Sequence, residues 1–129
     1  MTTLDTFQNI ILVSIGAVFG VNARFIIYHK LKEININGYI IILAINTFSC
    51  FILGLFISIL PKIKSLTFSS QLVLFFLIGF LGSLSTFSTF VYDLFDLCLK
   101  SKFCKALKLF SFSFSLGILA LALGSSLGN

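Results

Sequence analysis

Charged residues are scarce in this chain. Of its 129 residues, 4 are Asp or Glu and 9 are Lys or Arg. Charged side chains thus make up 10% of the sequence, against about a quarter in soluble globular domains. Hydrophobic residues make up 58%, and the mean hydropathy is +1.13. These values exclude an ordinary soluble domain and indicate an integral membrane protein.

Side chains typical of metal and redox sites are also rare. The sequence has one histidine and three cysteines. Cys50, Cys98 and Cys104 form no CxxC or Cys/His ligand spacing, so we interpret them as small hydrophobic residues. His29 lies among lysines outside the first apolar run, and we interpret it as an ordinary solvated histidine.

Four apolar runs are long enough to cross a membrane, which takes about 20 helical residues each. They cover about residues 7–28, 38–60, 71–98 and 106–127. The sequence therefore predicts an all-α integral membrane protein with a single transmembrane domain of four helices. The residues before the first run carry no positive charge, and that run is too long for the core of a signal peptide, so we expect them to be retained.

The third run contains an interruption of small and hydroxyl residues, from Gly79 to Phe90, with the sequence GFLGSLSTFSTF. Glycine, serine and threonine compete with helical backbone hydrogen bonding, so a break in the helix is expected here. Within a membrane, non-helical backbone is tolerated only where protein buries it or where it lines a wet cavity. The sequence therefore predicts a broken third transmembrane helix with a functional site at the break.

Polar and small residues in the first two runs allow more than one interpretation. Gly16, Gly20 and Arg24 share one helix face. The two glycines favour close helix packing, with a direct ligand role as the alternative. Arg24 either snorkels to the interface or anchors an anion or a backbone carbonyl. Asn46 in the second run either bonds a neighbouring helix or serves a polar site.

The basic residues are distributed unequally between the two sides of the membrane. Because spans alternate in direction, two lysines, Lys62 and Lys64, lie on one side. The other side has Lys30, Lys32, Lys100, Lys102, Lys105 and Lys108. The positive-inside rule then favours a single orientation with both termini outside. The lysines that follow the third span fit anionic lipid head groups, and we expect no nucleic-acid partner.

The interruption in the third run resembles the third-span signature of the Fluc/CrcB fluoride channels, usually written GxxGGxTTFSTF. The segment Gly16–Gly20 with Arg24-Phe25 is similar to that family's first-span pattern, and Asn46 falls at its second-span asparagine. The resemblance covers essentially the whole chain. This sequence departs from the pattern at Ser83, in place of a glycine, and at a span-four tyrosine, where Leu109 is found.

The resemblance implies an antiparallel dimer with two pores that exports fluoride passively across the cell (plasma) membrane. It also implies a structural Na⁺ held by the main-chain carbonyls of Gly82 and Ser85. The fluoride path would include Asn46, Phe87, Phe90, Ser88, Thr89 and Ser113. Arg24, Gly16 and Gly20 would be structural anchors. Conduction needs no catalysis, so we expect the protein not to be an enzyme.

The physical chemistry of fluoride agrees with this choice of residues. Fluoride is small and strongly hydrated, so a dry path must replace its water with hydrogen-bond donors. The amide of Asn46 and the serine and threonine hydroxyls can donate, and phenylalanine ring edges present weak positive charge to an anion.

Two other functions fit parts of the sequence. A small four-span multidrug exporter would need an intramembrane carboxylate, whereas every Asp and Glu lies at a span end or in a loop. A non-transporting membrane scaffold would explain the glycine packing but not the polar band in the third span. The unequal charge also predicts that the dimer partner is a separate, oppositely oriented homologue, because a chain that inserts both ways should carry little bias.

Overall fold

The structure, a computed structural model, describes residues 3–63 and 69–128. Lys64, which entered the charge comparison, lies outside these ranges. The helices are α1 (Thr3–Glu33), α2 (Gly38–Ile63), α3 (Ser69–Leu72), η1 (Val73–Leu81), α4 (Gly82–Leu84), α5 (Phe87–Leu99) and α6 (Phe103–Gly128). Four stretches of this helical chain are long enough and apolar enough to cross a membrane: Leu4–Glu33, Gly38–Lys62, Ser70–Leu99 and Phe103–Gly128. The prediction of an all-α, four-span membrane protein is confirmed.

One short turn connects α1 with α2, and another connects α5 with α6. Asn35 has a φ of 61°, and its N–H donates to the carbonyl of Lys32 at 3.1 Å. Asparagine tolerates this left-handed conformation, which ends α1. Ser101 has a φ of 56°, and the N–H of Lys102 donates to the carbonyl of Leu97 at 2.9 Å. These turns reverse the chain, so consecutive spans run antiparallel.

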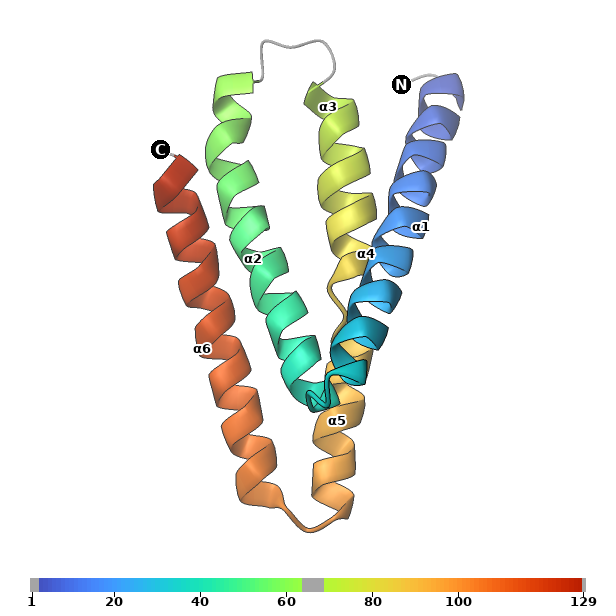
Figure 1. The fold of residues 1–129 in the computed structure, drawn as a ribbon. Helices are drawn as coiled ribbons and strands as arrows, with labels where there is room; N and C mark the ends of the chain where they lie inside the picture. The colour runs from blue at the N-terminus through green and yellow to red at the C-terminus, as the bar shows by residue number, and fades with distance from the viewer. Residues whose placement is uncertain (1–2, 64–68, 129) are drawn as a thin grey trace.

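The four spans form two pairs that diverge toward the end where both termini lie (Figure 1). In one pair α2 packs against α6, and in the other α1 packs against the first half of the third span. Glycines set the contact between α2 and α6. A Cβ at Gly54 would collide with the carbonyl of Leu121, and a Cβ at Gly124 would collide with that of Phe51. Small residues at these points let the two backbones approach closely.

The third span contains a π-helical segment, η1, that the sequence did not predict. Its nine residues, Val73–Leu81, are almost all large and apolar. An apolar run of this kind fits an α-helix, whose backbone hydrogen bonds join residues four apart, as well as a π-helix, whose bonds join residues five apart. Composition therefore could not distinguish the two geometries.

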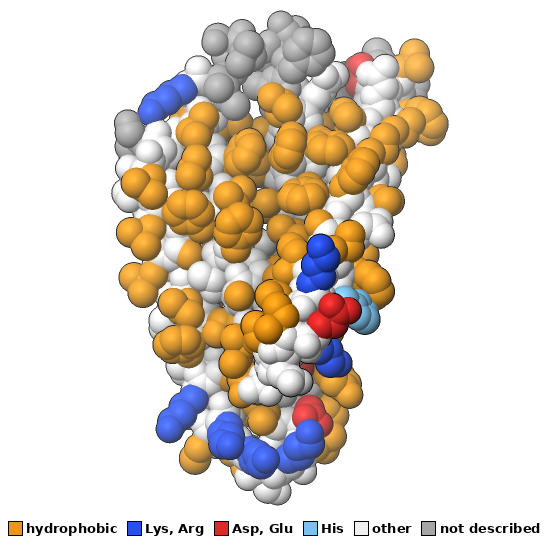
Figure 2. Space-filling view, viewed as in Figure 1, with side chains coloured by type: hydrophobic (Ala, Val, Ile, Leu, Met, Phe, Trp, Pro, Cys, Tyr) orange, Lys and Arg blue, Asp and Glu red, His pale blue; other side chains and the backbone are white. Residues whose placement is uncertain are grey.

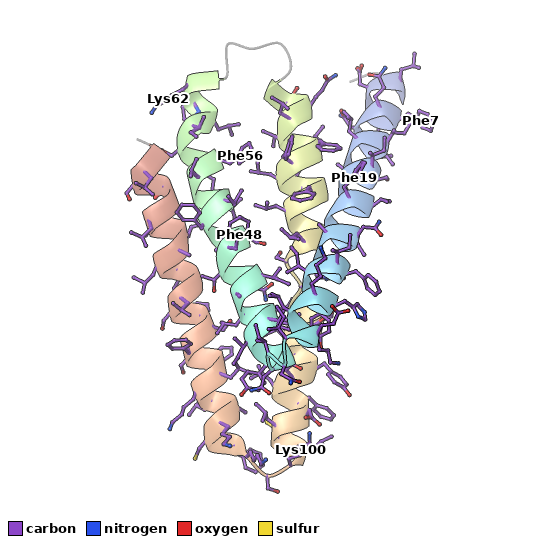
Figure 3. All side chains as sticks on the ribbon, in the orientation of Figure 1. Phe7, Phe19, Phe48, Phe56, Lys62 and Lys100 are labelled. Atoms are coloured by element: carbon purple, nitrogen blue, oxygen red, sulfur yellow. The ribbon has the colours of Figure 1, made fainter. Side chains whose placement is uncertain are left out.

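Few side chains of the described residues are buried within the chain, and one cluster of them lies near the middle of the third span. Ile41, Ile45 and Leu84 form the buried cluster. Hydrophobic side chains cover most of the surface in Figure 2, while lysine and arginine gather toward the lower end. Lys62 and Lys100 lie at opposite ends of the molecule (Figure 3). An apolar belt with charged ends is the arrangement expected for a protein surrounded by lipid.

Candidate functional site: the break in the third span

The third span is interrupted between α4 and α5, as predicted. Ser85 (φ −72°, ψ 146°) and Thr86 (φ −139°, ψ 120°) are extended, and the helix resumes at Phe87. Leu84 is 3% exposed and Thr86 is 6% exposed, so this chain buries these two residues of the break, while Ser85 is half-buried and Gly82 is exposed. This burial is what non-helical backbone requires inside a membrane.

The side chain of Asn46 on α2 holds the extended segment. Its Nδ2 donates to the carbonyl of Thr86 at 3.2 Å, and the N–H of Thr86 donates to Asn46 Oδ1 at 3.0 Å. In a continuous helix this N–H would donate to the carbonyl of Gly82. Asn46 therefore bonds a neighbouring span, which is one of the two roles that the sequence allowed for it. A carboxamide has two N–H donors, and the second finds no partner among residues 3–63 and 69–128.

Two carbonyl groups at the break have no hydrogen-bond donor in the described part of the chain. The carbonyls of Gly82 and Ser85 accept none from any residue that the structure describes. A helix that ends in mid-membrane leaves such carbonyls to be satisfied by another group. Within the described part of the chain, no group of three or more His, Cys, Asp or Glu side chains could hold a metal ion. A cation at this site would therefore depend on neutral oxygen atoms.

Three hydroxyl groups gather at the start of α5. Thr86 Oγ1 lies 3.2 Å from Ser88 Oγ and 3.3 Å from Thr89 Oγ1. The Thr86 side chain makes no capping bond to a backbone amide of α5. The first amides of α5 and the positive end of its dipole thus lie beside a group of polar hydroxyls. This arrangement is chemically suited to an anion.

A series of phenylalanine rings begins at the same place and crosses from α5 to α6. Phe87 is 78% exposed and Phe90 is 9% exposed, with their ring centroids 6.5 Å apart. Phe90 lies 6.5 Å from Phe110, which stacks on Phe114 at 6.3 Å. The sequence did not single out Phe110 or Phe114, because they are two of 17 phenylalanines. Their only signal was the alternation of phenylalanine and serine in that run.

Ser113 lies on α6, and no hydrogen bond among the described residues joins it to the break. Serines elsewhere in the spans bond back to their own helix: Ser14 donates to the carbonyl of Ile10 at 2.8 Å and Ser49 to that of Ile45 at 2.9 Å. Ser113 is half-buried, and its hydroxyl has no hydrogen-bond partner in the part of the chain described. The hydroxyl is therefore available to a ligand.

The glycine face of α1 lies against the third span just before the break. A Cβ at Gly16 would collide with the carbonyl of Phe75, and one at Gly20 with the carbonyl of Phe80. A Cβ at Gly79, on the other side of this contact, would lie 2.6 Å from the carbonyl of Val13. Close backbone approach accounts for the two glycines of α1.

Arg24, the third residue of the α1 stripe, is half-buried. Its guanidinium makes no ion pair or hydrogen bond with any other residue in the described ranges. Its role as a structural anchor stays a prediction.

Ser83, where the family pattern has glycine, connects α1 to the third span. Its Oγ lies 3.0 Å from the carbonyl of Ala17, 2.7 Å from that of Gly79 and 3.1 Å from that of Phe80. Its one hydroxyl hydrogen can serve any of these acceptors. Among the described residues, only Asn35 and Ser101 are non-glycine residues with positive φ, so the backbone at position 83 accepts a serine without strain.

Comparisons with known proteins agree with the architecture and the motif. A family model described as "CrcB-like protein, Camphor Resistance (CrcB)" matches residues 11–125. The chain is 57% identical over 122 residues to "Fluoride-specific ion channel FluC 2" of Prochlorococcus marinus (strain NATL2A), covering 95% of this chain and 98% of that protein. It is 35% identical over 118 residues to "Fluoride-specific ion channel FluC 1" of Prochlorococcus marinus (strain MIT 9313), covering 92% and 90%.

A more distant relative shares the same extent. "Fluoride-specific ion channel FluC" of Ignicoccus hospitalis is 31% identical over 117 residues, covering 91% of this chain and 92% of that protein. The similarity thus spans all four membrane-crossing segments rather than the motif alone. This chain belongs to the CrcB-like family.

Proposed function

We propose that this protein is a fluoride-specific ion channel that exports cytoplasmic fluoride passively across the plasma membrane. The observation that carries the proposal is the pairing of Asn46 with Thr86. It holds the third span open in mid-membrane, beside hydroxyl donors and a phenylalanine series. Membership of a family whose relatives are named fluoride-specific channels supports the choice of ion.

The residues around the break would replace the water that fluoride loses. The unused N–H of Asn46 and the hydroxyls of Ser88, Thr89 and Ser113 would donate hydrogen bonds to the anion. The rings of Phe87 and Phe90 would offer their positive edges, which attract an anion weakly enough to let it leave. No bond is made or broken in such a path, so the protein would act as a channel and not as an enzyme.

The direction of transport would follow from the membrane potential. Hydrofluoric acid, a weak acid, enters cells uncharged and dissociates in a less acidic cytoplasm, which leaves fluoride trapped inside. An inside-negative potential favours the exit of one negative charge by about 2.3 kcal/mol per 100 mV. Fluoride export through an open pore would therefore be downhill.

We propose that the main-chain oxygens at the break bind a structural Na⁺. The carbonyls of Gly82 and Ser85 would hold it in each subunit, since neither accepts a hydrogen bond within the described residues. Bound there, the ion would neutralise carbonyl dipoles that face no donor and would add positive charge beside an anion path. It would not be transported.

We propose that the functional unit is an antiparallel dimer with two pores. The two helix pairs diverge toward the end where both termini lie (Figure 1), and a single subunit of four helices is too thin to enclose a path alone. The lysine-rich end predicts a fixed orientation, so the partner would be an oppositely oriented homologue. Anionic lipid head groups would be the further partners of that end.

A liposome assay tests the function. Vesicles loaded with potassium fluoride receive the purified protein, alone or with an oppositely biased homologue, and a fluoride electrode follows release after valinomycin is added. We expect electrogenic fluoride release and no comparable release of chloride. Absence of fluoride flux from both preparations would contradict the proposal.

A further inference from the structure

A groove opens between α2, the end of α5 and the first half of α6. Its volume is about 890 Å³, and its lining includes Lys102, Lys105 and Lys108. We call these three residues the groove lysines. They begin two residues after Lys100, which lies at the lower end of the molecule in Figure 3, and the groove lining includes no residue of segment 79–90.

The groove lysines have no counter-charge among the residues that the structure describes. None of their side chains makes an ion pair or hydrogen bond within residues 3–63 and 69–128. Lys100 differs, because its Nζ donates to Asp96 Oδ2 at 2.5 Å and this hydrogen bond raises the pKa of Lys100. Three uncompensated positive charges along one groove attract an anion.

The rest of the lining is mainly apolar. Leu43, Leu97, Leu109 and Phe112 all contribute to it, and the Phe112 side chain is 59% exposed. A small water-soluble anion could meet the lysines but would leave these walls uncovered. The ligand that suits both parts of the lining has a negative head and a hydrocarbon chain.

The position and length of the groove match one leaflet of a bilayer. The third membrane-crossing stretch ends at Leu99 and the fourth begins at Phe103, so the groove lysines begin at the level of the head groups. Lys105 and Ser115 both line the groove, and they lie about 15 Å apart along a helix axis. This length is about half of a hydrocarbon core that is about 30 Å thick.

We propose that the groove binds one anionic phospholipid from the leaflet on the lysine side. Its phosphate lies among the groove lysines, and one acyl chain lies along Leu97, Leu109 and Phe112. The start of α6 at Phe103 adds the positive end of a helix dipole beside the phosphate. The proposal is independent of which ion the protein conducts, since no residue assigned to the fluoride path takes part.

Native mass spectrometry of the full-length protein in a neutral detergent tests this. The protein is titrated with phosphatidylglycerol and, separately, with phosphatidylcholine of the same acyl chains. We expect preferential retention of phosphatidylglycerol, with each groove lysine contributing about five-fold. Lys105→Gln/Lys108→Gln should then weaken phosphatidylglycerol binding about 25-fold, while Lys105→Arg/Lys108→Arg should retain it.

Lys30→Gln/Lys32→Gln is the matched control. It removes the same charge from the same side of the membrane, and neither residue lines the groove. Binding in this variant should stay within about two-fold of the unmodified protein, because only the groove lysines contact the phosphate.

Four results would overturn the proposal. The two lipids could be retained equally by the unmodified protein, a comparison that depends on no variant. The control variant could lose as much binding as the groove variant. Glycerol phosphate could compete at the same concentration as the lipid, which would indicate a simple anion site. The Phe112→Cys variant could cross-link to a second copy and exclude lipid, which would assign the groove to a subunit interface.

Discussion

Asn46 and Thr86 are 40 positions apart in the chain and pair as two residues of adjacent β-strands do, with one N–H and one carbonyl oxygen from each. The carboxamide of Asn46 takes the place of a strand's peptide group. It therefore gives a helical protein a short piece of sheet-like pairing in mid-membrane. Backbone groups there have no water to bond, so the pairing lowers the cost of the break.

Replacing Asn46 with alanine should destabilise the protein and stop conduction. Hydrogen bonds between membrane spans average about 0.6 kcal/mol and reach about 1.7, so the loss of two should cost about 1 to 3 kcal/mol. Unfolding of purified Asn46→Ala in detergent measures this cost. Ser49→Ala is the control, because the Ser49 hydroxyl on the same helix donates to the carbonyl of Ile45 and bonds no other span among the described residues. Equal stability of the two variants would contradict the role of Asn46.

Gly20→Ala should push α1 away from the third span. The added Cβ would collide with the carbonyl of Phe80 and the hydroxyl of Ser83, and overpacking of this kind costs about 1 to 3 kcal/mol. Gly117→Ala is the matched control. Its Cβ would lie 3.6 Å from the sulfur of Cys50, an ordinary contact, and alanine favours a helix by about 1 kcal/mol over glycine. Thermal denaturation should therefore show opposite shifts.

Ser83→Ala should weaken the contact between α1 and the third span by about 0.5 to 1.5 kcal/mol, the usual net contribution of one hydrogen bond. The loss is limited because the hydroxyl has one hydrogen to give to its three neighbouring carbonyls. Denaturation in detergent measures it. Ser14→Ala, which removes a hydroxyl that bonds only within α1, should change stability less. A larger loss in the control would show that Ser83 does not connect the spans.

Phe87→Ala should reduce fluoride release without unfolding the protein. The Phe87 ring is 78% exposed, so its removal creates no cavity within the chain. If the ring edge contacts the permeating anion, we expect release in the liposome assay to fall at least about ten-fold, the effect of about 1.4 kcal/mol. Phe95→Ala removes a ring from the same helix that is 60% exposed, and it should leave release unchanged. Equal release from both variants would show that the Phe87 ring does not line the anion path.

The sequence by itself determined the class of protein and the place of its break. Hydropathy decides membrane insertion residue by residue, so four runs of apolar residues were enough to predict four spans. The glycines and hydroxyl residues of segment 79–90 were enough to predict where the third helix stops, because their preference against helix is local.

Only the tertiary structure decided which groups the break leaves available. Asn46 could have bonded any neighbouring span, and its choice of Thr86 depends on how α2 lies beside the third span. The same packing brings Phe110 next to Phe90 and places Leu43 of α2 beside the groove lysines. Such contacts join residues far apart in the chain. The periodicity of apolar residues in a sequence shows on which face of a helix a residue lies, but not which other helix that face contacts.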